Sequence, residues 1–195
     1  MNTRRAIMRA AADVWAEKGY HEATVEDLCN AAGIGRSTYY LHFESKERLL
    51  VEFALATAEG VNSDVDDAVR HGSFDDEIEA FVEGLASRME HTPRSLAVTI
   101  MRQVALNSVA ARELGRDQIL FDDVLSRIVR DGQQQGRIRL DIVPADVGEV
   151  MAGMVVDALQ RWAAGDVDRT LRESLDLRIA LVLQGIAAGH DRAPG

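Results

Sequence analysis

Cysteine and proline are nearly absent from this chain of 195 residues, which contains one cysteine and three prolines. A single thiol, Cys29, cannot form an internal disulfide or a cysteine-rich zinc cluster, so we expect a protein of a reducing, cytoplasmic setting. Aromatic residues make up only 5% of the chain, and runs of β-branched residues are scarce. Alanine, arginine and leucine are among the most frequent residues instead, which favours helices and predicts an all-α fold.

Long apolar runs are missing as well. The longest, MAGMVV at residues 151–156 and IALVL at residues 179–183, fall far short of the ~20 residues that a membrane-spanning helix needs. Charged side chains interrupt the first helical segment, which excludes the apolar stretch of a secretory signal. We therefore expect a soluble protein with no membrane partner.

The sequence also lacks local signatures of catalysis and metal binding. The five histidines show no HExxH or other metal-ligand spacing. No Ser-His-Asp or Cys-His arrangement is suggested by local motifs. We accordingly expect no enzyme activity, no metal and no cofactor.

Negative charge predominates, but it is unevenly distributed. The formal net charge is −10, yet residues 1–50 contain seven Lys or Arg and seven Asp or Glu. The remaining 15 basic and 25 acidic residues all lie in residues 51–195. We call residues 1–50 the head and residues 51–195 the body. A neutral head can present a local basic face to a polyanion, while the acidic body keeps non-specific binding weak.

Three short helical segments are predicted within the head. Apolar residues at helical spacing indicate a helix over residues 4–18 that ends at Gly19. Thr24 is a typical N-cap for a second helix, which Gly33 ends after about two turns. A third helix is expected over residues 36–42, and Ser45 begins a fourth. Two short helices joined by a tight glycine-containing turn, after a longer supporting helix, predict a helix-turn-helix.

The predicted helix-turn-helix indicates DNA binding and not nucleotide binding. Gly33 and Gly35 lack the third glycine of a dinucleotide fingerprint and follow a helix instead of a strand. A helix-turn-helix places its second helix in the major groove, where Arg36 can contact guanine or phosphate. The predicted DNA contacts are Thr24, Arg36, Ser37, Thr38, Tyr40, His42 and Lys46. Tyr39 is expected to point into the core, because adjacent helical residues point about 100° apart.

The head resembles the DNA-binding domain of TetR-type transcriptional repressors. The resemblance covers residues 4–50, about a quarter of the chain, and is carried by AA at residues 11–12, WAEKGY at 15–20, ATV at 23–25, AAGI at 31–34, TYY at 38–40, HF at 42–43 and SKE at 45–47. It implies a helical body that binds a small molecule and dimerises through its last two long helices. Gly35 and Leu41 depart from the family pattern, which usually has Ser or Thr, and a polar or basic residue, at these positions.

Helical segments are predicted in the body near residues 46–70, 74–91, 94–108, 111–135, 145–164 and 168–188. Pliable apolar residues and a few polar ones within them are candidates for an effector site: Phe81, Met89, Met101, Gln103, Asn107, Phe121, Met151 and Met154. The last two segments are apolar over wide arcs, which require burial on more than one side. Their candidate dimer contacts are Val155, Leu159, Trp162, Leu175, Ile179, Val182, Leu183 and Ile186.

These observations predict an all-α homodimeric transcriptional regulator. We expect a repressor that binds a palindromic, double-stranded operator and is released from it by a small apolar or amphipathic effector. Two alternatives stay open at this point. One is a DNA-binding regulator that needs no ligand, and the other is a helical protein–protein adaptor that no longer binds DNA.

Overall fold

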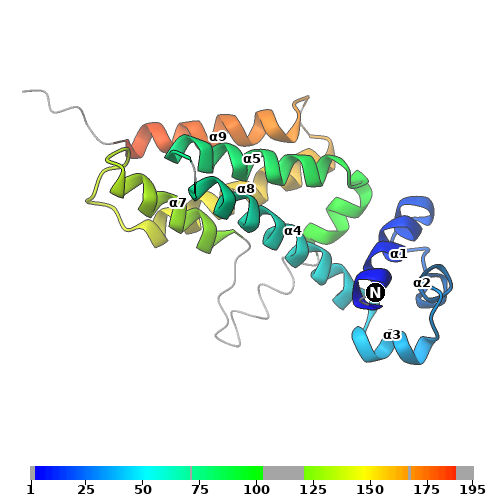
Figure 1. Ribbon diagram of the computed structural model, residues 1–195. Coiled ribbons are helices and arrows are strands. Elements are labelled where there is room, and N and C mark those ends of the chain that lie inside the picture. Colours follow the sequence, from blue (N-terminus) through cyan, green and yellow to red (C-terminus); the bar gives the residue numbers. More distant parts are fainter. Residues whose placement is uncertain (1–2, 71, 103–120, 167, 188–195) are drawn as a thin grey trace, which may run out of the picture.

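The computed structural model describes residues 3–70, 72–102, 121–166 and 168–187 (Figure 1). Its helices are α1 (Thr3–Lys18), α2 (Val25–Ala32), α3 (Arg36–His42), α4 (Lys46–Val69), α5 (Phe74–Glu90), α7 (Asp122–Gln134), α8 (Pro144–Ala164) and α9 (Leu171–Ile186). Residues 94–102 are also helical. Across these ranges the only β pairing is one isolated bridge between Ile138 and Ala187, which confirms the all-α expectation. None of the described helices is long and apolar enough to cross a membrane.

Several helix ends coincide with capping signals in the sequence. Thr24 begins α2 with a reciprocal capping box to Asp27, and Gly33 ends it with φ 65°, a left-handed conformation that glycine adopts without strain. Ser45 accepts a hydrogen bond from the backbone N–H of Arg48 at 3.1 Å and so starts α4. Thr170 caps α9, which therefore starts at residue 171, three residues later than predicted.

Helices α1–α3 form a separate group at one end of the molecule, and α4 runs from this group into the body (Figure 1). The start of α4 buries Leu49 and Leu50, whereas Val61 and Val65 are buried further along the same helix. The predicted boundary at residue 50 therefore lies within a helix and not at a flexible linker. All of these side chains belong to one continuous cluster of buried residues.

In the body, α4, α5, α7, α8 and α9 run side by side (Figure 1). Helices α7 and α8 pack closely at Gly148, where a Cβ atom would lie 2.7 Å from the backbone N of Ser126 and 2.9 Å from the carbonyl O of Asp122. A glycine is needed there because no side chain fits between the two backbones. Arg178 on α9 also donates to Asp157 on α8 at 3.1 Å, which fixes the relative position of these two helices.

Candidate DNA interface and small-molecule cavity

Helix α3 turns one face to the core of the head and the other to solvent. Tyr39 is fully buried and its hydroxyl donates to the carbonyl O of Ser45 at 3.3 Å, while Tyr40 is 49% exposed. The expectation that Tyr39 points inward is thereby confirmed. The exposed or half-exposed side chains of α3 include five of the predicted DNA contacts, namely Arg36, Ser37, Thr38, Tyr40 and His42.

Two further features of α3 shape this surface. Its N-cap, Gly35, makes no side-chain capping bond, so no side chain projects from the backbone at the start of the helix, and a Cβ atom there would meet only Oγ of Ser37, at 3.8 Å. Leu41 is 83% exposed on the outward side and contributes nothing to the core.

Thr24 is already engaged within α2. Its hydroxyl donates to Oδ2 of Asp27 at 2.8 Å and accepts from the backbone N–H of Asp27 at 3.1 Å. Lys18 donates to the other carboxylate oxygen at 2.6 Å, and this bond, with those from Thr24, holds the pKa of Asp27 well below its ordinary value. The carboxylate is therefore charged at neutral pH, and the Thr24 hydroxyl proton is not available to a phosphate.

Lys46 points into the head and not away from it. Its ammonium donates to the carbonyl oxygens of Tyr20 and Ala23, both at 2.8 Å, and lies 4.4 Å from the centre of the Tyr20 ring. Burial, reinforced by Glu47, raises the pKa of Tyr20 to about 12, so the ring stays neutral beside the cation. The structure thus gives Lys46 a structural contact in place of the predicted phosphate contact.

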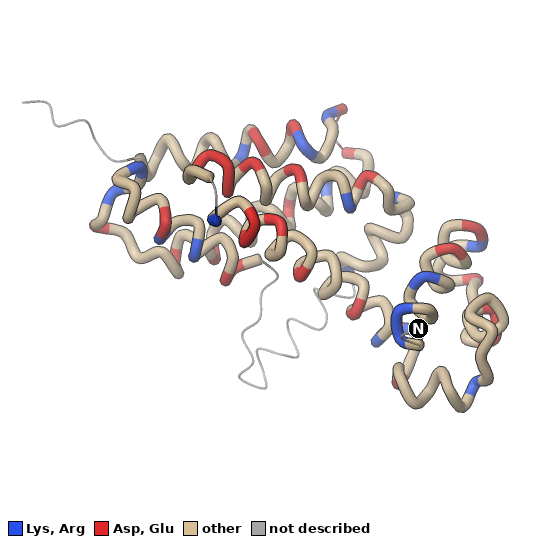
Figure 2. The backbone as a smooth tube through the Cα atoms, viewed as in Figure 1, with Lys and Arg blue, Asp and Glu red and all other residues tan. Residues whose placement is uncertain are grey.

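The cations of the head differ in whether a carboxylate neutralises them. Lys18 pairs with Asp27 and Arg4 pairs with Glu52. Arg36 makes no ion pair with any residue that the structure describes, and it lies exposed at the start of α3. Acidic positions gather along α4 and α5 in the body, away from α3 (Figure 2). The outward face of α3 therefore presents an uncompensated positive charge.

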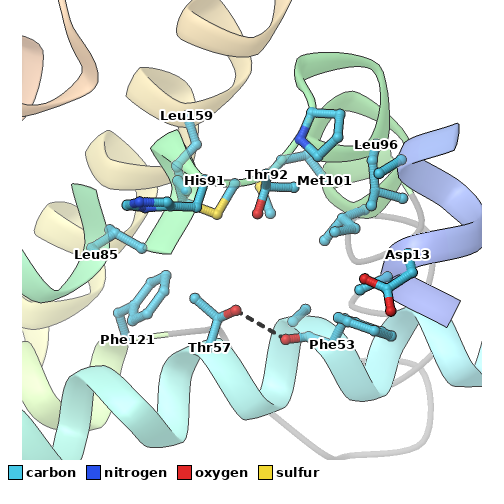
Figure 3. A pocket seen from close by; sticks show the side chains of 16 residues that line it. Asp13, Phe53, Thr57, Leu85, His91, Thr92, Leu96, Met101, Phe121 and Leu159 are labelled. Atoms are coloured by element: carbon cyan, nitrogen blue, oxygen red, sulfur yellow. Dashed lines mark hydrogen bonds between the residues drawn. The ribbon is translucent and has the colours of Figure 1, made fainter. Parts of the chain in front are cut away.

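A cavity of about 220 Å³ lies where the head meets the body (Figure 3). Helix α1 of the head contributes Ala12, Asp13 and Ala16 to its wall, and the other lining residues belong to the body. Figure 3 shows Asp13 on the α1 side and Phe121 and Leu85 on the opposite side. A molecule in this cavity would contact both parts of the protein at once.

The predicted effector residues are only partly brought together. Met89, Met101 and Phe121 line the cavity. Phe81 packs behind them, with its ring centre 5.6 Å from that of Phe121. Met151 is fully buried in α8 and Met154 is half-buried there, and neither lines the cavity. Gln103 and Asn107 lie outside the described residues.

Four polar side chains of the cavity, or of its rim, were not foreseen as effector contacts. They are Asp13, Thr57, His91 and Thr92. Their positions on separate helices and in the connection after α5 show no common spacing in the sequence.

The predicted dimer contacts divide into two groups. Five are 0–5% exposed and belong to the core of the single chain: Val155, Leu159, Trp162, Leu175 and Ile179. Because they are covered within one chain, they cannot supply the surface that meets a partner, and the assignment is corrected. The other three, Val182, Leu183 and Ile186, are half-exposed. The exposed apolar side chains of α8 and α9 are Val150, Leu177 and Leu181.

Comparisons with known proteins agree on the kind of molecule this chain is similar to. A model of the tetR family of bacterial regulatory proteins matches residues 7–53. Over 183 residues the chain is 30% identical to the HTH-type transcriptional repressor AcnR of Corynebacterium efficiens, covering 91% of this chain and 90% of that protein. It is 27% identical over 178 residues to the HTH-type transcriptional regulator UidR of Escherichia coli, covering 90% and 89% of the two chains.

The fold is similar to that of FadR from Thermus thermophilus, a TetR-family transcriptional repressor whose structure was solved in complex with lauroyl-CoA. The TM-score is 0.76 and the identity 24%, over 98% of this chain and 99% of that chain.

The contact made by Lys46 predicts a loss of stability when its ammonium is removed. Lys46→Met keeps the aliphatic stem but leaves two carbonyl oxygens without their charged donor, so we expect the free energy of unfolding to fall by about 1.5–3 kcal/mol. Arg36→Met is the matched control and should change stability by less than about 0.5 kcal/mol, since Arg36 is exposed. Urea denaturation followed by circular dichroism measures both. Equal stabilities for the two variants would show that the Lys46 contact is dispensable.

Proposed function

Because the chain belongs to the tetR family of bacterial transcriptional regulators, we propose that it represses transcription as a homodimer whose operator affinity is controlled by a small molecule. The observation that carries this proposal is the cavity between head and body, with Asp13 on α1 forming part of its wall. In this proposal residues 1–50 bind DNA, and residues 51–195 bind the effector and dimerise.

The outward face of α3 is suited to the major groove. Arg36 supplies an unpaired guanidinium that can bind guanine through two hydrogen bonds or contact a phosphate. Ser37 and Tyr40, both exposed, supply hydroxyl donors next to it. In a dimer the two α3 helices would meet successive major grooves about 34–36 Å apart on a palindromic operator.

A protein of this fold can bind an organic ligand, as the Thermus thermophilus FadR structure with lauroyl-CoA illustrates. In this chain, Phe53 of α4 links the cavity to the core of the head, because its ring centre lies 5.2 Å from that of Trp15 on α1. A ligand that contacts α1 and the body together favours the head orientation in which both surfaces fit it. If the operator requires a different orientation, binding of the ligand lowers DNA affinity.

Dimerisation would use the exposed side of α8 and α9. Val150 is 64% exposed, Leu181 is 62% exposed, and a shallow hollow between α8 and α9 is lined by Val147, Val150, Val182 and Ile186. A partner copy that covers this surface removes apolar area from water. The buried side chains of the same helices remain in the core of each chain.

Operator binding should depend on Arg36. We expect the wild-type protein to bind DNA from upstream of its own gene more tightly than scrambled DNA, with an affinity that falls as salt rises. Arg36→Ala should weaken this binding roughly tenfold or more, because a specific arginine–base contact contributes about 1–3 kcal/mol. Arg70→Ala, at the end of α4, is the matched control. Fluorescence anisotropy at two salt concentrations measures these affinities. An unchanged affinity in Arg36→Ala would show that α3 is not the helix that recognises the operator sequence.

Filling the cavity should abolish the effector response. A panel of small apolar amines, alcohols and acids is screened for compounds that lower the operator affinity of the wild type, by roughly 5- to 150-fold for a typical allosteric coupling. Ala16→Trp places an indole at the cavity wall, so the same compounds should change its affinity less than about twofold. Ala56→Trp, on the exposed side of α4, is the control and should respond normally. A full response in Ala16→Trp would place the effector elsewhere.

Charge on the proposed dimer surface should separate the two chains. Leu181→Glu and Val150→Glu each place a carboxylate in an apolar contact, where an unpaired charge is strongly unfavourable. We expect light scattering after gel filtration to give half the wild-type mass. Val69→Glu introduces the same charge at a 41% exposed valine of α4 and should leave the mass unchanged. A wild-type mass in both α8 and α9 variants would contradict the proposed surface.

A further inference from the structure

The size of the cavity sets the size of its ligand. Its volume is about 220 Å³. Benzene occupies an apolar cavity of about 150 Å³ in another protein, so this one has room for one aromatic ring with a short chain. Most of the described lining is apolar, and in Figure 3 the side chains of Leu85, Phe121 and Leu159 lie on the side of the cavity away from Asp13. A compact hydrocarbon body fits this interior.

The polar groups of the cavity are set up to accept hydrogen bonds. The Thr57 hydroxyl donates to the carbonyl O of Phe53 at 3.0 Å, and the Thr92 hydroxyl donates to the carbonyl O of Arg88 at 3.1 Å. Each proton is therefore used within its own segment, and only oxygen lone pairs remain for a ligand. A ligand must therefore supply the hydrogen-bond donors.

His91 is also held within its own segment. Its Nδ1 lies 2.5 Å from the carbonyl O of Ser87, which can only accept, so Nδ1 carries a proton and donates it to this carbonyl.

Asp13 adds a negative charge at the edge of the cavity. It is exposed, so the cavity opens to solvent beside it, and Figure 3 shows its carboxylate on the cavity side of α1. No lysine or arginine pairs with Asp13 or lines the cavity within the described part of the chain. An anionic ligand would meet a like charge here, whereas a cation would meet an unpaired carboxylate.

We infer that the effector is a compact apolar amine, whose ammonium group binds Asp13 at the cavity opening while its hydrocarbon part enters the body. An ammonium has three N–H donors and no acceptor, which complements the acceptor atoms described above. The carboxylate lies on α1 and the apolar lining lies in the body, so such a ligand ties the two together. This inference rests on the proposed function, in which the cavity is the effector site.

Three probes of nearly equal shape test the charge preference. Phenethylamine, phenethyl alcohol and phenylacetate share one ring and one chain length but are cationic, neutral and anionic at neutral pH. Isothermal titration calorimetry measures their binding to the full-length wild type, to Asp13→Asn and to Glu17→Gln. Glu17 lies one turn further along α1, is exposed, and does not line the cavity.

We expect the wild type and Glu17→Gln to bind phenethylamine at least roughly tenfold more tightly than phenethyl alcohol, and phenylacetate most weakly. In Asp13→Asn the preference for the amine should fall to about twofold or less, with binding of the alcohol unchanged. Equal or tighter binding of the neutral or anionic probe by the wild type would overturn the amine inference and leave the cavity as the effector site. No binding of any probe at millimolar concentration would overturn both.

Discussion

Helix α4 belongs to two parts of the molecule at once. Its first turns carry Leu49 and Leu50 into the core of the head, and Val61 and Val65 lie further along, in the body. With 24 residues it is about 36 Å long at 1.5 Å per residue, and no break separates its two ends. The head therefore cannot swing freely on a linker. Its orientation is set by α4 and by whatever contacts α1 makes with the body.

The cavity lies where α1 faces the body. If this space were filled by side chains, α1 would be fixed to the body and the head would have a single orientation. A hollow of about 220 Å³ leaves that contact incomplete, and a ligand can complete it. Because the hollow opens to solvent, its apolar lining contacts water, and a ligand that fills it removes this apolar area from water. A hollow between the head and the body is therefore suited to a ligand that changes the orientation of the head relative to the body.

Local signals in the sequence predicted the helices well. Threonine or serine caps and glycine stops act within a few residues of the helix ends, so Thr24, Gly33 and Ser45 could be identified without knowledge of the fold. The inward direction of Tyr39 also follows from helical spacing alone. The family resemblance could also be found from the sequence, because the helix-turn-helix that carries it spans fewer than 50 consecutive residues.

Contacts between distant residues were the part that the sequence could not predict. Lys46 has the charge and position of a phosphate contact, and its use by the carbonyls of Tyr20 and Ala23 depends on a loop 23–26 residues earlier in the chain.

The prediction of the dimer contacts was wrong for a related reason. A wide apolar arc on α8 or α9 does not show which half the single chain covers, so Leu159 and Leu175 were assigned to the wrong side. Asp13 and Thr57 were missed because only the tertiary fold places α1 and α4 around one cavity.

The proposed function requires that the cavity and the operator site be energetically coupled. Linkage requires that a cavity ligand change operator affinity by the same factor by which operator DNA changes ligand affinity. We would therefore measure the affinities of the wild-type protein for phenethylamine and for its operator, each with and without a saturating amount of the other. We expect the ligand and the operator to weaken each other's binding by equal factors of at least about fivefold. Binding of the ligand in the cavity with no change in either affinity would contradict the proposed function.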